Sequence, residues 1–320
     1  MASLEPHHAD PGKTHYVTGA NGISLRAREW GNSANPTVLL VHGYPDNSSA
    51  WDDVVPALST NFHVVTYDVR GAGASQPGEQ FGGYAFKLLI EDFGSVLDQV
   101  VPDGRAVHVV AHDWGAMQSW EAVLDETVSK RVASYTYFGA PALDHAMHWI
   151  RARIRPNPRD LAELAQQLVK SWYIYLFHIP VAAPTLWRNG LDKVVPHFMA
   201  FADKQPVRPG DDMFAADGRR GVGLYRANFI PKLLNPGEGR TDIPIQAIVT
   251  DGDWFVNPKL FAETVRRIPN LYRRDLHAGH WINRSHPDQV AAWVTEFVRF
   301  IANGEETNSI RDARVAAIAG

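Results

Sequence analysis

The segment VVAHDWG, residues 109–115, places a carboxylate, Asp113, where a side chain could act as a nucleophile. The apolar run before it predicts a buried parallel strand, and the periodic stretch after it predicts a helix. Ala111 and Gly115 stand two positions on either side, and small residues at that spacing are typical of the sharp strand-to-helix turn called a nucleophile elbow. Such a turn holds its central side chain above the sheet edge, beside a helix N-terminus that attracts oxygen anions. Asp113 is therefore a candidate nucleophile, and the alternative is that it only caps the helix.

A nucleophilic carboxylate needs a base as its partner, and two histidines near the end of the chain could supply one. Asp113 would be ionised at neutral pH and could attack a strained or activated carbon directly, forming an ester. A base must then activate water to split that ester. The segment LHAGHW, residues 276–281, holds His277 and His280. We expect His280 to be the base because it follows Gly279 in a turn, whereas His277 stands near the end of a predicted strand.

An imidazole base also needs an acid that holds its tautomer and orientation. The segment TDGDW, residues 250–254, supplies Asp251 and Asp253 after another predicted strand. The chain order nucleophile, acid, histidine is the one that goes with a nucleophile elbow. We expect Asp253 to be the acid and Asp251 to form the turn, since aspartate is a common turn residue, and Asp251 remains the alternative acid.

Composition excludes several other classes of function. The chain has 320 residues, of which 45% are hydrophobic and 21% charged, as in an ordinary globular protein with an ample core. Its formal net charge of −4 gives no reason to expect nucleic acid or an anionic membrane surface as a partner. The absence of cysteine excludes disulfides, thiolate nucleophiles and cysteine-bound metal. No apolar stretch is long enough to span a membrane and no signal-peptide region is visible, so we expect a cytoplasmic protein.

Cofactors are not expected either. Two glycine-containing segments, TGANG at residues 18–22 and GAGAS at residues 71–75, lack the further glycine of a dinucleotide-binding fingerprint. The 14 histidines show no spacing typical of a metal site. The sequence therefore predicts chemistry by side chains alone, with neither cofactor nor metal.

The order of predicted elements indicates how the candidate residues are positioned. Two strands, 15–19 and 23–30, are joined by an Asn-Gly hairpin signal. Strands at 37–41, 62–67, 105–111 and 132–138 then alternate with helices, and the alternation resumes with strands at 243–250 and 271–276. This pattern predicts an α/β fold with a mostly parallel, doubly wound sheet.

The chain changes character between these two β/α regions. From residue 141 to 240 the strand signals stop, and short helical runs such as 159–177 take their place. A helical insertion of this kind is typical of a cap, or lid, over an active site. We therefore expect a core formed by residues 1–140 and 241–302, a helical cap formed by 141–240, and a tail or linker over 303–320.

Four motifs, taken in order, resemble those of the α/β-hydrolase-fold epoxide hydrolases. They are HGYP at 42–45, DVRGAGAS at 68–75, HDWG at 112–115 and GHW at 279–281, and the resemblance extends over about residues 15–302. It implies conversion of an epoxide to a vicinal diol through an alkyl ester on Asp113, hydrolysed by water that His280 activates. It also implies an oxyanion hole formed by the backbone N–H groups of Tyr44 and Trp114, with Pro45 in the cis form.

The same resemblance implies two cap tyrosines that hold the epoxide oxygen. The segment SWYIYLFHIP, residues 171–180, is similar to the first tyrosine segment of the family and gives Tyr173, with Tyr175 as the alternative. GLYRAN, residues 223–228, resembles the second and gives Tyr225. A phenol can donate a hydrogen bond to a developing alkoxide and then transfer its proton. The competing interpretation is that all three tyrosines only pack the cap.

Two other functions compete with this interpretation. Haloalkane dehalogenases share the aspartate, the histidine and Trp114, but they usually have asparagine where this chain has Tyr44, and they lack the paired tyrosines. A non-catalytic hydrolase-fold binding protein is the second rival, and the complete set Asp113, Asp253 and His280 argues against it.

Substrate and assembly are less constrained by the sequence. The aromatic and aliphatic residues of the predicted cap favour a small apolar epoxide, such as a lipid epoxide, as the substrate. A homodimer is compatible with the sequence. The end of the chain, RVAAI at 314–318, could begin a linker, and the chain resembles the hydrolase half of two-domain actinobacterial hydrolase–dehydrogenase proteins.

Overall fold

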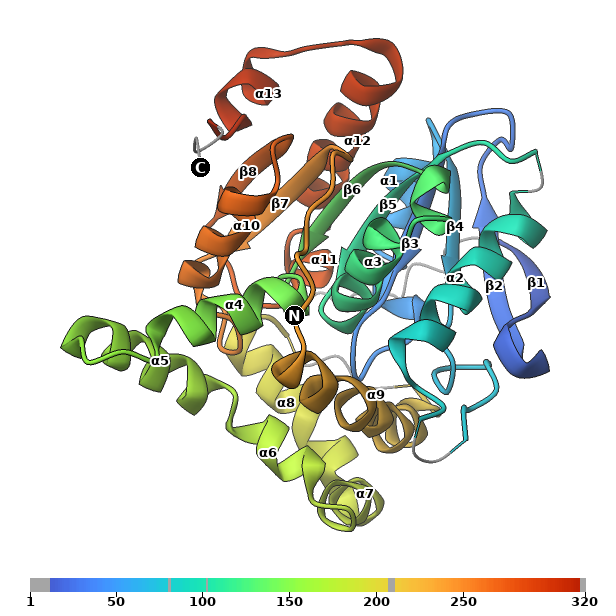
Figure 1. Cartoon of the computed structure of the whole chain (residues 1–320). Coiled ribbons are helices and arrows are strands. Elements are labelled where there is room, and N and C mark those ends of the chain that lie inside the picture. The colour runs from blue at the N-terminus through green and yellow to red at the C-terminus, as the bar shows by residue number, and fades with distance from the viewer. Residues whose placement is uncertain (1–11, 80–81, 102, 207–210, 317–320) are drawn as a thin grey trace.

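An eight-stranded sheet runs through the centre of the protein, with helices on both of its faces (Figure 1). The structure is a computed structural model that describes residues 12–79, 82–101, 103–206 and 211–316. The strand order is β1-β2-β4-β3-β5-β6-β7-β8; β2 pairs antiparallel with β1 and with β4, and all the other neighbours pair parallel. The predicted α/β fold with a mostly parallel, doubly wound sheet is therefore confirmed.

The strands form where the sequence has short apolar runs. Because helices cover both faces of the sheet, the central strands are buried along their whole length and read as continuous apolar segments. The hairpin between the first two strands turns at Asn21 and Gly22, both with positive φ, as its Asn-Gly signal predicts. The strands are β1 (Lys13–Thr18), β2 (Ser24–Trp30), β3 (Thr37–Val41), β4 (His63–Tyr67), β5 (Val107–His112), β6 (Val132–Phe138), β7 (Ile245–Thr250) and β8 (Leu271–Leu276).

Two layers of helices bury the faces of the sheet. One layer contains α2 (Phe86–Val100), α3 (Trp114–Leu124) and α10 (Phe261–Arg267); the other contains α1 (Val55–Ser59), α11 (Ile282–Ser285) and α12 (Pro287–Asn303). In α12, Val290, Val294 and Val298 recur every four residues and are fully buried. Burial of each such side chain contributes about 1.5–3 kcal/mol, so a periodic stripe of this kind docks the helix on the sheet.

The chain between β6 and β7 forms helices joined by loops, with no strand among its described residues. Its helices lie together below the sheet in Figure 1, over the ends of the strands that lead to the predicted site. The run predicted as one helix over 159–177 is divided at Ser171 into two. The helices are α4 (Leu143–Arg153), α5 (Pro158–Lys170), α6 (Trp172–His178), α7 (Ala182–Leu186), α8 (Asp192–Asp203) and α9 (Phe214–Leu234), with a π-helical turn at Trp187–Leu191.

Helix α9 is 21 residues long, where the sequence predicts only short helical runs. Glycine is a weak helix former, and the glycines at 218, 221 and 223 conceal the helical pattern. In the structure, the space that a Cβ at each of them would fill is occupied by the rings of Trp187, Tyr44 and Tyr84 respectively. These glycines therefore allow three aromatic rings to pack directly on the backbone of α9.

The segment predicted as a tail or linker carries a short helix that packs on the core. In α13 (Asn308–Ala313), Ile310 is buried against a cluster that contains Tyr272 and Phe297. Thr307 Oγ1 accepts a hydrogen bond from Ile310 N at 3.1 Å and caps the helix, and Arg314 forms an antiparallel bridge with Tyr272. The polar composition conceals this element because few apolar residues anchor it. Residues 317–320 of the predicted tail or linker lie outside the described residues.

Gly115→Ala should destabilise the turn between β5 and α3. A Cβ at Gly115 would lie 2.3 Å from Val41 O and 2.5 Å from His42 O, so β3 and α3 would have to move apart. We expect the free energy of unfolding to fall by about 1–3 kcal/mol, as for other overpacked sites, measured by urea denaturation. Gly94→Ala in α2 is the control: its Cβ would meet only Val128 Cγ2 at 3.7 Å, and stability should rise by roughly 0.5–1 kcal/mol through helix propensity. Equal stability of the two variants would contradict the close approach.

Candidate active site

Asp113 stands at the end of β5, on the turn into α3. Its φ of 51° and ψ of −119° are a conformation that the surrounding backbone must impose, because it costs a non-glycine residue of order 1–3 kcal/mol. Asp113 N donates to Phe138 O at the end of β6 (3.1 Å), and a Cβ at Gly43 would lie 2.5 Å from Asp113 Cβ. The side chain accepts no hydrogen bond from the first turn of α3, so it does not act as a cap. The predicted elbow is present, and its carboxylate lines a cavity.

A backbone N–H from the loop after β3 reaches this carboxylate. Tyr44 N donates to Asp113 Oδ1 at 2.8 Å, and the Tyr44–Pro45 peptide is cis, as the family resemblance implies. Trp114 is the first residue of α3, so its N–H has no acceptor within the helix. The two backbone groups expected to form an oxyanion hole therefore both lie next to Asp113.

The side chain of Tyr44 connects this loop to the cap. Its hydroxyl donates to Gly218 O in α9 at 2.9 Å and accepts from Trp187 Nε1 at 2.8 Å. The ring centroid of Tyr44 lies 5.3 Å from that of Tyr225, which is also on α9. The loop after β3, whose backbone binds Asp113, and helix α9, which carries Tyr225, are thus held together.

His280 lies between two carboxylates. Its Nδ1 is 2.7 Å from Asp253 Oδ2, and its Nε2 is 3.6 Å from Asp113 Oδ2. Asp253 Oδ1 accepts hydrogen bonds from the N–H groups of Phe255 and Val256, so the acid is oriented by its own turn. All three ionisable groups are buried. The three residues predicted to work together are brought into one cluster from the ends of three different strands.

The two alternative residues lie elsewhere. His277 Nδ1 is 2.9 Å from Asp251 Oδ2, and both side chains are largely exposed to solvent. Neither residue lines the cavity at Asp113. The structure therefore places Asp253 and His280 beside Asp113 and leaves the other pair at the surface.

The two carboxylates control the protonation of His280. Burial alone lowers the pKa of an imidazole, but the negative charges of Asp253 and Asp113 and their hydrogen bonds outweigh it and raise the pKa of His280 to about 10. The imidazole is therefore a cation at neutral pH. Because the pKa is raised on folding, the stability that this proton contributes is fully present below the ordinary value of 6.5 and is lost as the pH rises through about 10.

Tyr173 and Tyr225 reach the same cavity from two cap helices, α6 and α9. Their ring centroids are 5.9 Å apart, and the Tyr225 ring lies 4.8 Å from the ring of Trp114. Burial raises the pKa of both phenols, and the negative charge of Asp113 raises it further, so both stay protonated at neutral pH. Tyr175, the alternative to Tyr173, is exposed and does not line the cavity.

The cavity between the sheet and the cap has a volume of about 570 Å³, suited to a small organic ligand. Its wall is mainly aromatic and aliphatic. Apart from the tyrosines, its ionisable groups among the described residues are Asp113, His280 and Lys170, and the ammonium group of Lys170 donates to the backbone oxygen of Asp253. An apolar molecule with one polar reactive group fits this lining.

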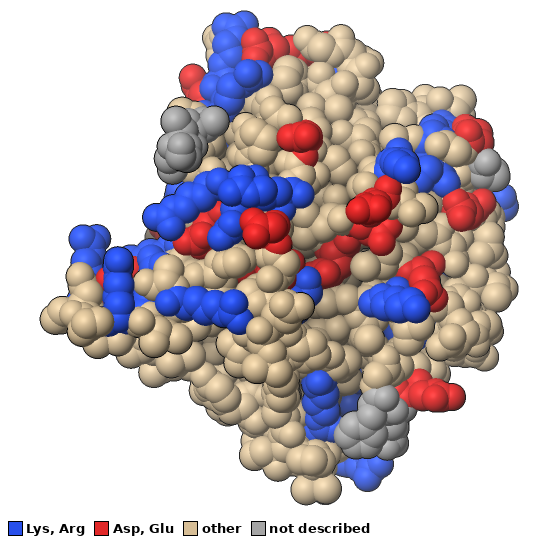
Figure 2. Space-filling model, viewed as in Figure 1, with Lys and Arg blue, Asp and Glu red and all other residues tan. Residues whose placement is uncertain are grey.

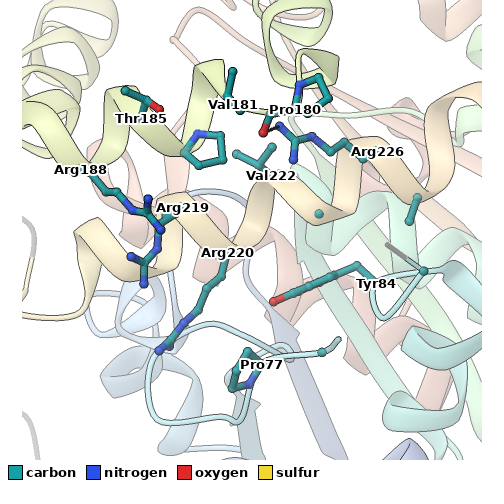
Figure 3. A pocket seen from close by; sticks show the side chains of 15 residues that line it. Pro77, Tyr84, Pro180, Val181, Thr185, Arg188, Arg219, Arg220, Val222 and Arg226 are labelled. Carbon is teal, nitrogen blue, oxygen red and sulfur yellow. Dashed lines mark hydrogen bonds between the residues drawn. The ribbon is translucent and has the colours of Figure 1, made fainter. Parts of the chain in front are cut away.

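A larger cavity, of about 840 Å³, contains none of these groups. It lies along α9, on the face turned away from Tyr225, and Figure 3 shows the arginine side chains that extend into it. No acidic side chain of the described residues lines it. Its arginines are Arg188, Arg219, Arg220 and Arg226.

Sequence reasoning missed the residues that hold the loop of His280. Asp203, at the end of α8, accepts from the N–H groups of His280 (2.8 Å) and Trp281 (2.7 Å). His112 Nε2 is 3.1 Å from His280 O. A Cβ at Gly279 would lie 2.1 Å from Asp203 Oδ1, so glycine is needed there. No local motif marks Asp203, because it lies 77 positions from His280 in the sequence.

The described residues contain neither a metal-binding cluster nor a membrane-spanning helix. Among them, no three side chains of the metal-ligating types gather closely enough to hold a metal ion. None of the described helices is long and apolar enough to cross a membrane.

Comparison with known proteins gives the chain its family. Residues 38–293 match the alpha/beta hydrolase family. The chain belongs to this family. Epoxide hydrolase A of Mycobacterium tuberculosis is 37% identical to it over 325 residues, which cover 89% of this chain and 97% of that protein. The "Probable oxidoreductase EphD" of the same organism is 34% identical over 93% of this chain but only 52% of its own length, so the chain spans about half of that relative.

Solved structures share the fold of this hydrolase. An epoxide hydrolase from Bacillus megaterium superposes with a TM-score of 0.72 at 22% identity, over 89% of this chain and all of that one (100%). Epoxide hydrolase VrEH1 from Vigna radiata superposes with a TM-score of 0.70 at 21% identity, over 91% of this chain and 99% of that one. With the relatives above, these likenesses confirm the resemblance to α/β-hydrolase-fold epoxide hydrolases that the four motifs predict.

Removal of the charge on Asp113 should lower the pKa of His280. In Asp113→Asn a neutral amide replaces the carboxylate and leaves only Asp253 to hold the proton. The pKa of His280 should then fall from about 10 to about 7–9, as expected when one nearby opposite charge is lost. An NMR titration of the His280 ring measures this. Asp251→Asn is the matched control and should leave the titration of His280 unchanged; the same pKa in all three proteins would show that Asp113 does not act on His280.

Proposed function

We propose that the protein is an epoxide hydrolase that converts an apolar epoxide into a vicinal diol through an ester on Asp113. The observation that carries this proposal is that Asp113, the His280–Asp253 pair and the two cap tyrosines meet at one apolar cavity. Opening an epoxide without a cofactor requires a nucleophile, a proton donor for the ring oxygen and a base for water. The names of the relatives, in particular Epoxide hydrolase A, support the same reaction.

The first step forms the ester. Tyr44 N–H holds Asp113 Oδ1, which leaves Oδ2 as the attacking oxygen. Attack of Oδ2 on an epoxide carbon forms one C–O bond and breaks the ring C–O bond, so that negative charge moves to the ring oxygen. The hydroxyls of Tyr173 and Tyr225 donate hydrogen bonds to that oxygen, and one of them transfers its proton to it.

Ester formation prepares His280 for the second step. The ester is neutral, so His280 loses one of the two negative charges that hold its pKa near 10. Its proton passes to the tyrosine that gave one up, and the neutral imidazole then takes a proton from water. The resulting hydroxide attacks Asp113 Cγ, while the N–H groups of Tyr44 and Trp114 stabilise the oxyanion. Collapse of this intermediate releases the diol and restores the carboxylate and the imidazolium.

Haloalkane dehalogenation through the same aspartate is the rival reaction. It calls for a second halide donor beside Trp114, in the position where this chain has Tyr44. The hydroxyl of Tyr44 is engaged with Gly218 O and Trp187 Nε1, which argues against a role as that donor. Release of chloride from chloroalkanes, measured alongside diol formation from epoxides, distinguishes the two activities.

His280→Gln should trap the ester, because only the second step needs the base. Intact mass spectrometry after addition of substrate should show the protein heavier by one substrate mass. His277→Gln is the matched control: it removes an exposed histidine of the same loop and should turn over substrate like the wild type, with no lasting adduct.

The same experiment distinguishes the ester route from direct attack of water on the epoxide, which would leave no adduct in any variant. Asp113→Asn should form no adduct and no diol, since it lacks the nucleophile. If His280→Gln accumulates no adduct at substrate concentrations that the wild type consumes, Asp113 is not the nucleophile and the proposed reaction scheme fails.

Replacement of either cap tyrosine should slow ester formation. Tyr173→Phe and Tyr225→Phe each remove one donor to the developing alkoxide, which should raise the barrier of that step by about 2–4 kcal/mol. The rate is measured in single turnovers in the His280→Gln background, where only the first step is observed. The double variant should be slower than either single one, and Tyr175→Phe, with its exposed ring, should react at the unmodified rate. Unchanged rates in all variants would reduce these tyrosines to packing residues.

A further inference from the structure

Exposed apolar side chains surround the mouth of the catalytic cavity. Trp172 (63% exposed), Val194 (60%), Phe198 (36%) and Trp254 (49%) line the cavity and also face solvent. Phe201 (68% exposed) extends this surface, since its ring centroid lies 5.7 Å from that of Trp254. These five residues are termed the mouth patch. Single exposed apolar residues are ordinary, but a group of this kind marks a surface that binds something.

Helix α8 supplies three members of the mouth patch as a stripe. Val194, Phe198 and Phe201 are spaced four and three positions apart and therefore lie on one face of the helix. Lys193 and Lys204, both exposed, lie on the same helix and at its C-cap. An exposed apolar stripe edged by lysines is typical of helices that lie in the surface of a membrane with anionic lipids.

Further positive charge lies on the cap, across helix α7 from the catalytic cavity. Helix α7 separates the two cavities. Leu186 lines the catalytic cavity, whereas Thr185 and Arg188 line the larger one. Arg188, Arg219 and Arg220 extend into the larger cavity and form no ion pair with a carboxylate of the described residues (Figure 3). The cap surface over α6 and α7 is largely uncharged, with basic side chains at its edge (Figure 2). An apolar centre with a basic margin complements a lipid layer with anionic headgroups.

We propose that the mouth patch and its lysines bind the surface of a membrane that contains anionic lipid, so that a lipophilic epoxide passes from the lipid into the cavity. A second copy of the chain could also cover an apolar patch. However, the cavity opens through this patch, so a tightly packed protein would close the route of the substrate, whereas a lipid layer would supply it. The delivery of an epoxide rests on the proposed function; the binding of the membrane does not.

Cosedimentation with large unilamellar vesicles tests the binding separately from activity. Wild-type protein should pellet with vesicles of equal parts phosphatidylglycerol and phosphatidylcholine, and less with phosphatidylcholine alone. Phe201→Ser should lower the affinity for the mixed vesicles roughly tenfold or more, because a buried phenyl ring is lost from the interface. Lys193→Glu should weaken binding to the mixed vesicles only, and added salt should have the same effect.

Matched controls separate this surface from general stickiness. Tyr16→Ser removes an equally exposed aromatic (67%) from the edge strand β1, and Lys87→Glu reverses an exposed charge on α2. Both should bind vesicles like the wild type. Because Phe201 and Lys193 do not line the cavity, their variants should hydrolyse a water-soluble epoxide at the wild-type rate when no vesicles are present.

Three outcomes would overturn the proposal. The first is wild-type protein that stays in the supernatant with both kinds of vesicle, and the second is equal binding by wild type and Phe201→Ser. The third is a dimer that Phe201→Ser converts to a monomer in the absence of vesicle binding, which would assign the patch to a second copy. Vesicle binding by a protein that forms no diol would instead leave this surface in place and refute the proposed function.

Discussion

The balance of charge among Asp113, His280 and Asp253 is the interaction on which the active site depends. Isolated buried charges are costly, and here one cation lies between two anions, with Nδ1 and Nε2 directed at one carboxylate each. Backbone N–H groups of Tyr44 and Phe255 supply further positive ends of dipoles to the two carboxylates. A reaction that neutralised Asp113 would disturb this balance, lower the pKa of His280 and release its proton, so that the neutral imidazole could accept another.

The parallel sheet explains how residues so distant in sequence form this cluster. The carboxyl ends of parallel strands meet at one edge of a sheet, and the turns after β3, β5, β7 and β8 supply Tyr44, Asp113, Asp253 and His280 there. The cap completes the site from the other side. It contributes two tyrosines and also Asp203, whose carboxylate orients the backbone of the histidine loop. Core and cap are therefore parts of one site.

The proposed membrane surface shows how far local charge can depart from overall charge. A formal net charge of −4 gives no reason to expect an anionic partner. The fold nevertheless gathers exposed rings from α6, α8 and the loop after β7 around one opening, and Lys193 and Lys204 lie beside them. Such a grouping depends on which faces the core leaves uncovered, which composition does not record.

The sequence by itself determined the features that depend on local patterns. These are the strands, from short apolar runs; the elbow at Asp113, from small residues at a set spacing; and the two short segments that hold Asp253 and His280. Only the tertiary structure decided between neighbours of equal chemistry. Asp253 rather than Asp251 contacts His280, and Tyr173 rather than Tyr175 lines the cavity, because the direction of a turn or helix face depends on what packs against it. Asp203, the long helix α9 and the packed helix α13 were beyond local patterns, because they are stabilised by contacts between residues far apart in the chain.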